Sequence, residues 1–333
     1  MKTCQKASPT RQARRMSGST LLVALATLVA VAARPSAFAA TVAHWDFETD
    51  LIAGSATTGQ TVSHPSANGI HDNAIPDISG NGNHLSAFAQ NGSFTAMLFS
   101  NVVAPNSQTG TTLSIENAPA ACCGVLSTQD DLEVGGVNVG AMAAWTIEAS
   151  VNFKGLGGFQ TIVGKDGFGE ATNGDTRQAV LYFQKINTNL FRINFVDVQG
   201  YAHIADSITL AEVGKWYHLA ATSDGNTLRL FVNGLQEAAF DMTATASTNR
   251  AMAALNEAGF EGAGTVAPYG WTTHRGMYND GHGDRVNGYI DDVRISDVAL
   301  ASGDLLFAIP EPATLLLASV AMAGLAAVGR QRR

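Results

Sequence analysis

The sequence predicts an all-β domain of two packed antiparallel sheets, and two observations lead to this fold class. Apolar and polar residues alternate at period two in several runs, among them Trp145 to Phe153 and Leu228 to Val232. The dipeptides Asp224-Gly225 and Asn233-Gly234, which favour tight hairpin turns, flank the second run. Helical periodicity is nearly absent away from the two ends of the chain, apart from a short surface helix expected over Thr245 to Ala258.

The hairpin region shows how each strand is expected to present its side chains. Successive side chains of a strand point to opposite faces, so Leu228, Leu230 and Val232 should face the core, with Arg229 and Phe231 on the other side. The run from Leu126 to Val134 is a further expected strand.

Five segments in order along the chain carry a shared pattern. They are Val42 to Glu48, Asp77 to Asn83, Trp145 to Phe153, Lys215 to Phe240 and Gly288 to Leu300. Together they resemble the laminin-G-like, concanavalin A-like jelly roll family over roughly residues 42–307. The resemblance implies a two-sheet jelly roll sandwich over residues 40–308. Because this family shares a fold and not a single activity, the fold alone does not decide the function.

Residues 1–39 have the organisation of a secretory signal peptide. Arg11, Arg14 and Arg15 precede an apolar run from Leu21 to Ala33, and Ala37-Phe38-Ala39 is a small-residue cleavage signal, so the mature chain is expected to begin at Ala40. The competing interpretations are a membrane anchor, for which the run is short, and a twin-arginine signal.

Residues 309–333 resemble the PEP-CTERM sorting tail of Gram-negative bacteria. Pro310, Glu311 and Pro312 precede an apolar stretch that ends in Arg330, Arg332 and Arg333. The resemblance implies an exosortase as sorting partner, transient anchoring in the inner membrane through this segment, and delivery to the exterior or outer surface of the cell. A plain C-terminal membrane anchor is the alternative.

Processing at both ends would leave a strongly acidic protein. Nine of the 20 Lys and Arg lie in the leader and tail, so the mature chain keeps eleven against 28 Asp and Glu, a net charge of −17. Such a surface repels phosphate backbones, so nucleic acid is not expected as a partner.

The mature chain keeps two cysteines, Cys122 and Cys123, whose adjacency excludes a conventional stapling disulfide. A vicinal disulfide, two buried thiols and an intermolecular link remain open.

The polar faces of three strands form the candidate ligand surface. If Trp145 to Phe153, Phe191 to Val196 and Leu228 to Val232 lie in one sheet, one face gathers Glu148, Ser150, Asn152, Arg192, Asn194 and Arg229. The family resemblance implies that this face can bind glycans. The alternative is a solvated face with cross-strand pairs.

A glycine-rich stretch from Gly259 to Arg285 is expected as a long loop that carries aromatic residues. Tyr269 and Trp271 are its candidate ligand contacts at the rim of the face, because sugar rings stack on aromatic rings. Local packing of these aromatics is the alternative.

Carboxylates near the two ends of the domain suggest a structural calcium ion. The resemblance implies such an ion where the N- and C-terminal strands meet, with Asp291, Asp77 and Asp46 as its candidate ligands, and oxygen ligands suit calcium. The alternative is an ion pair of Asp291 or Asp292 with Arg294 and turn capping by Asp77.

No catalytic motif accompanies these features. The E-x-D-x-x-E run of laminarinase-type glycosidases, G-x-S-x-G and H-E-x-x-H do not occur. We therefore expect a non-enzymatic exported protein that binds a polysaccharide or another matrix component. A purely structural or adhesive surface protein and a glycosidase with an unrecognised site are the alternatives.

Overall fold

The computed structural model describes residues 41–63, 73–89, 97–105, 111–117, 124–128, 141–168, 180–253, 267–276 and 284–307. All belong to the unit Ala39–Arg333. No helix in this part of the chain is long and apolar enough to span a membrane. The predicted cleavage site at Ala39 and Ala40, the cysteine pair and the sorting motif lie outside the described residues.

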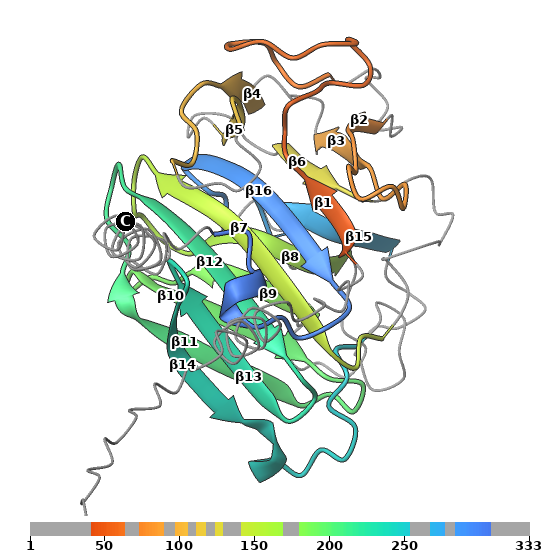
Figure 1. The fold of residues 1–333 in the computed structure, drawn as a ribbon, viewed down its shortest axis with the longest axis vertical. Helices are drawn as coiled ribbons and strands as arrows, with labels where there is room; N and C mark the ends of the chain where they lie inside the picture. The colour runs from red at the N-terminus through yellow and green to blue at the C-terminus, as the bar shows by residue number, and fades with distance from the viewer. Residues whose placement is uncertain are drawn as a thin grey trace, which may run out of the picture. The chain divides into compact units, whose positions relative to one another are not determined.

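The described residues form two antiparallel sheets that lie face to face (Figure 1). Sheet A contains, in spatial order, β14 (Leu235–Asp241), β13 (Thr227–Val232), β12 (Trp216–Ser223), β7 (Trp145–Phe153), β16 (Gly288–Ser296), β5 (Ser114–Asn117) and β4 (Met97–Ser100), with β1 (Thr41–Trp45) paired to β16. Sheet B contains β11 (Ala202–Leu210), β10 (Leu190–Val196), β9 (Leu181–Lys185), β8 (Gln160–Phe168), β15 (Ala267–Thr273), β6 (Gly124–Ser127), β3 (Leu85–Ala89) and β2 (Asn73–Ile75). Short 3₁₀ helices lie at Met242–Ala244 and Ser302–Asp304. The predicted all-β, two-sheet antiparallel sandwich is confirmed.

Aromatic residues from the facing sides of the two sheets meet in the core. The rings of Trp145 in sheet A and Phe195 in sheet B pack edge to face at 5.2 Å, and those of Phe153 and Phe191 stack at 6.3 Å. Such pairs contribute about 0.5–1.5 kcal/mol each beyond the apolar area that they bury. The period-two pattern therefore packs as a jelly roll requires.

The hairpins follow the turn prediction. Asn233 and Gly234 connect β13 to β14 with φ angles of 51° and 75°, the left-handed conformation that a two-residue turn of this type needs. Leu228, Leu230 and Val232 lie in the core cluster, whereas Phe231 packs in a separate cluster on the other face, as predicted.

The structure corrects the assumption that three polar strand faces share one sheet. β7 and β13 lie in sheet A, but β10 pairs with β9 and β11 in sheet B. Since each core face points inward, the polar face of β10 lies on the opposite side of the sandwich from that of β7. The alternation was correct, but the sheet membership of β10 was wrong because alternation does not specify a strand's partners.

Two further local predictions change. The expected loop over Gly259 to Arg285 contains β15, which pairs with β8 and β6. The described part of the expected helix over Thr245 to Ala258, which ends at Ala253, is not helical. The expected strand over Leu126 to Val134 is described as β6 only to Ser127.

Candidate functional site

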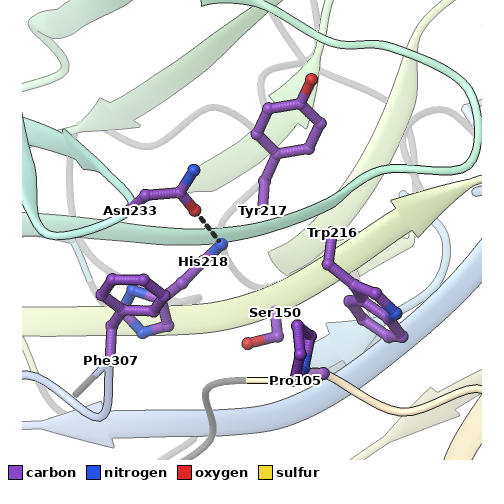
Figure 2. Close-up of a pocket in the computed structure, with 8 residues that line it drawn as sticks. Pro105, Ser150, Trp216, Tyr217, His218, Asn233 and Phe307 are labelled. Atoms are coloured by element: carbon purple, nitrogen blue, oxygen red, sulfur yellow. Dashed lines mark hydrogen bonds between the residues drawn. The ribbon is translucent and has the colours of Figure 1, made fainter. Parts of the chain in front are cut away.

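A small cavity opens on the outer face of sheet A (Figure 2). Its volume is about 110 Å³, and its walls come from five separate parts of the chain. They are Ala104, Pro105, Ser150, Trp216, Tyr217, His218, Asn233 and Phe307. None of these side chains carries a fixed charge, so the cavity favours a neutral group.

The floor of the cavity comes from two neighbouring strands. His218 on β12 lies directly opposite Ser150 on β7, and both side chains are nearly buried. Asn233 in the adjoining hairpin turn fixes this arrangement, because its Oδ1 accepts a hydrogen bond of 2.9 Å from the backbone N–H of His218. Its own N–H donates to the carbonyl of His218 at 2.7 Å. The turn that the sequence predicts thus positions a wall of the cavity.

The other wall is the last described segment of the chain. In this C-terminal segment (residues 297–307), Leu305 packs against Ala220 and Phe231. The ring of Phe307 stacks on His218 with centroids 5.4 Å apart. Figure 2 shows Ser150 between this stacked pair and the side chains of Pro105 and Trp216.

The carboxylate of Glu148 anchors the C-terminal segment from below. Oε1 accepts from the Arg294 guanidinium, with a distance of 2.7 Å to Nε, and Oε2 accepts from the backbone N–H of Leu306 at 2.7 Å. Nε2 of His218 lies 3.2 Å from Oε2. Burial alone would raise the pKa of Glu148, but His218, Arg294 and the Leu306 N–H together hold it below its usual value. An ionised carboxylate therefore fixes one wall of the cavity from within the fold.

His218 has unused hydrogen-bonding capacity. The side chain is only 4% exposed, and the contact of its Nε2 with Glu148 lies outside hydrogen-bond geometry. Its Nδ1 is buried and has no hydrogen-bond partner among the described residues. A buried polar atom without a partner is costly, and because Nδ1 is enclosed by the fold, a ligand in the cavity does not reach it.

Trp216 is the tryptophan available to a ligand at this site. The other three, Trp45, Trp145 and Trp271, are completely buried in the core. The indole of Trp216 is partly exposed and leans toward the Tyr289 ring, with centroids 6.4 Å apart. It therefore presents a flat apolar surface beside the polar floor.

Two predicted ligand residues of sheet A are held by ion pairs. Glu148 is fully buried beneath the C-terminal segment, so the expectation that it faces a ligand is wrong. Arg229 lies at the Asp224 hairpin, where its Nη1 is 2.8 Å from Oδ2 of Asp224. The cross-strand pairs that formed the alternative interpretation are therefore present.

Arg192 and Asn194 lie on the outer face of sheet B, away from the cavity. Nε and Nη2 of Arg192 bind both oxygens of Asp206 at 2.6 and 2.7 Å. This pair, formed across β10 and β11, raises the pKa of Arg192. Ligand binding by Arg192 or Asn194 stays a prediction, separate from the site on sheet A.

The expectation that Trp271 lies at an exposed rim is wrong. It belongs to β15, where its side chain is 0% exposed and packs in the core, with Nζ of Lys165 5.5 Å from the ring centroid. Tyr269 belongs to the same strand, and its side chain is not among those described.

The candidate calcium ligands have different environments. Asp77 caps the turn that follows it, because its carboxylate accepts from the backbone N–H groups of His44, Ser79 and Asn83. Asp46 accepts from the backbone N–H of Glu48, and burial raises its pKa. Among the described residues, no three His, Cys, Asp or Glu side chains are grouped as a metal site requires. The predicted set thus does not fit an ion held by side chains alone.

Of the three candidate calcium ligands, Asp291 has the carboxylate environment that best suits a bound cation. Its Oδ2 accepts from Ala104 N–H and Thr111 Oγ1, but its buried Oδ1 has no partner. Burial, with the nearby charges of Asp292 and Glu48, raises the pKa of Asp291 to about 7. The ion pair expected for Arg294 forms with Glu148 instead, while Asp292 contacts His44 at 3.2 Å.

A comparison with models of known protein families shows to which family this chain belongs. A family model described as the concanavalin A-like lectin/glucanases superfamily matches residues 126–305, more than half of the 333 residues. The chain belongs to this superfamily. A second model, the PEP-CTERM protein-sorting motif, matches residues 308–333, which indicates an exported protein that passes through the membrane. Comparison with curated proteins finds no match.

The solved structures with similar folds have low sequence identity and low TM-scores to this superfamily member. A carbohydrate-binding module of the Ruminococcus gnavus IT-sialidase, bound to α2,3-sialyllactose, is 13% identical with a TM-score of 0.39, covering 50% of this chain and 82% of that one. Domain 4 of the arabinanase AbnA from Geobacillus stearothermophilus, in complex with arabinotriose, is 13% identical with a TM-score of 0.45, covering 80% and 96%. Likenesses of this size carry no argument about a ligand.

Proposed function

We propose that the mature chain is a non-enzymatic exported protein that binds a neutral polysaccharide outside a Gram-negative cell, through the cavity on sheet A. The observation that carries the proposal is Trp216, the partly exposed indole at a cavity with a polar floor and no charged wall. Sugar rings stack on indoles with their apolar faces, while their hydroxyls need hydrogen-bonding partners at the edge. The Ser150 hydroxyl supplies such a partner beside the indole.

The small volume of the cavity favours a ligand that stays mostly in solvent over one that the protein encloses. Pockets that enclose small molecules usually measure roughly 300–1,000 Å³, whereas this one measures about 110 Å³. A polymer would therefore lie along the surface and insert one group. Such binding suits a long chain of repeated sugars, because the rest of the polymer stays in solvent.

The position of Glu148 favours binding over hydrolysis. Glycoside hydrolysis generally needs two carboxyl groups that flank the scissile bond. Glu148 is covered by the C-terminal segment and engaged by Arg294 and Leu306, so it does not reach a bound sugar. This argument supports a binding protein over the glycosidase alternative.

Titration of the mature chain with neutral polysaccharides tests the proposal. Trp216→Ala should weaken binding about tenfold or more, since loss of a stacking contact at a binding centre costs on the order of 1–3 kcal/mol. Tyr201→Ala, which removes an exposed aromatic ring between β10 and β11 of sheet B, is the matched control and should bind as the native chain does. Equal binding by the Trp216 variant would reject the site, and an absence of glycan binding would favour a purely structural surface protein.

Export and sorting complete the proposal. An exosortase would recognise the tail that contains Pro310, Glu311 and Pro312, and the mature protein would begin near Ala40 and lose the residues after this motif. The membrane would be contacted only through the tail before processing. Mass spectrometry of the protein from its native host tests this, since an intact Arg333 in released protein would contradict sorting by cleavage.

A calcium ion near Asp291 is proposed from the family resemblance and the unpartnered Oδ1. Its remaining ligands would have to include backbone carbonyls, which calcium accepts readily. Chelation should then lower the melting temperature of metal-loaded protein, and Asp291→Asn should remove this sensitivity. An unchanged melting temperature in chelator would discard the ion.

A further inference from the structure

The cavity on sheet A has the size of a sugar substituent and not of a sugar ring. An engineered protein cavity of about 150 Å³ holds benzene, so on the same scale about 110 Å³ accommodates roughly four non-hydrogen atoms. A pyranose with its hydroxyls has more than twice that number. The group that enters is therefore a side group of the polymer, while the ring itself remains at the Trp216 surface.

The walls of the cavity divide into an apolar and a polar half. Ala104, Pro105 and Phe307 offer carbon atoms, whereas Ser150 offers a hydroxyl group. A carboxylate, sulfate or amine would find no opposite charge among the residues that line the cavity. The group that matches these walls is neutral and carries both a methyl and a polar end.

The polar half offers the hydroxyl of Ser150. This hydroxyl makes no hydrogen bond to the described residues, so it can donate to a ligand. The ring nitrogens of His218 are buried and do not reach the cavity. The carbonyl oxygen of an amide is a suitable acceptor for the Ser150 hydroxyl.

We propose that the cavity recognises the acetamido group of an N-acetylated amino sugar within the polysaccharide. This inference rests on the proposed glycan binding and names its ligand class. The acetamido group has one nitrogen, one oxygen and two carbons, which matches the space. Its methyl packs against Pro105 and Phe307, its carbonyl accepts from Ser150, and its N–H stays at the open mouth of the cavity, while the sugar ring stacks on Trp216.

We assign Ser150 as a specificity-determining residue, because it can be varied without removing a hydrogen bond to the described residues. Ser150→Thr keeps the hydroxyl but adds a methyl group to the small cavity, and Ser150→Ala removes the donor. Both should reduce the preference for acetamido sugars and leave stacking on Trp216 intact. Ser302→Ala, which alters an exposed serine of the 3₁₀ helix, is the matched control.

The test is calorimetric titration of the mature chain with chitotriose and cellotriose, which differ in the acetamido group at each sugar. Chitotriose should bind at least about tenfold more tightly, which corresponds to about 1.4 kcal/mol. Ser150→Thr should collapse this difference. N-propanoylglucosamine should bind more weakly than N-acetylglucosamine, because the added methylene exceeds the space.

Three results would overturn the inference. Equal binding of both trisaccharides, still lost in Trp216→Ala, would reject acetamido recognition but leave the proposed glycan binding in place. A full preference for chitotriose in both Ser150 variants would place the acetamido group elsewhere. Binding of neither these sugars nor any neutral polysaccharide would remove the inference together with the proposed function.

Discussion

Replacing Trp271 by alanine should lower the stability of the fold far more than replacing Trp216, although the chemical change is identical. Trp271 is completely buried in sheet B, whereas Trp216 is partly exposed on sheet A. Burial of an indole removes roughly 150–250 Å² from water, and at about 25 cal/mol per Å² this corresponds to about 4–6 kcal/mol. Loss of the contact with the Lys165 ammonium adds to the cost.

The expected loss of unfolding free energy is therefore about 4 kcal/mol for Trp271→Ala and below about 1 kcal/mol for Trp216→Ala. A domain is typically stable by about 5–15 kcal/mol, so the first variant should be close to unfolding. Urea unfolding of both variants, followed by far-ultraviolet circular dichroism, measures the difference. A Trp271 variant within 1 kcal/mol of the native chain would refute its assignment to the core.

Three further predictions concern buried groups. His274 is completely buried and burial lowers its pKa to about 3, so the folded state stays neutral while the unfolded state takes up a proton below about pH 6.5. Stability should therefore fall as the pH is lowered from 6.5 toward 3, by up to about 1.4 kcal/mol per unit, and a His274→Asn variant should lose this contribution in pH-dependent urea unfolding. A chain that ends at Asp304 should be less stable by about 3 kcal/mol than one that ends at residue 308. The shorter chain lacks the buried side chain of Leu305 and the hydrogen bond that the N–H of Leu306 donates to Glu148. Equal melting temperatures of the two chains would contradict this prediction. Gly288→Ala should destabilise the fold by more than about 3 kcal/mol or prevent folding, since the added Cβ would lie 2.0 Å from a backbone oxygen of β7, and a native-like yield and melting temperature would disprove the close approach.

Much of the fold could be predicted because its information is local. The alternation of Leu228, Leu230 and Val232 and the Asn233-Gly234 turn need only neighbouring residues, and the structure contains both as expected. Strand pairing is not local. Nothing within Phe191 to Val196 shows that it pairs with β9 and β11 instead of β7, so the placement of Arg192 was wrong.

The site was harder to predict because it combines distant segments. Glu148 and Leu306 are 158 residues apart, and no pattern in either segment indicates that one covers the other. Trp271 was misplaced because a glycine-rich stretch resembles a loop until its partner strand is known. Trp216 and His218 could have been found, since both alternate with the core residues Tyr217 and Leu219 and so point outward.

The central claim is that a neutral glycan binds at Trp216, and nuclear magnetic resonance of the four indole N–H groups tests it most directly. In ¹⁵N-labelled mature protein titrated with chitotriose, the indole signal of Trp216 should shift and saturate with the calorimetric Kd. The signals of the buried Trp45, Trp145 and Trp271 should stay in place. A saturating ligand that leaves the Trp216 signal unmoved would contradict the account.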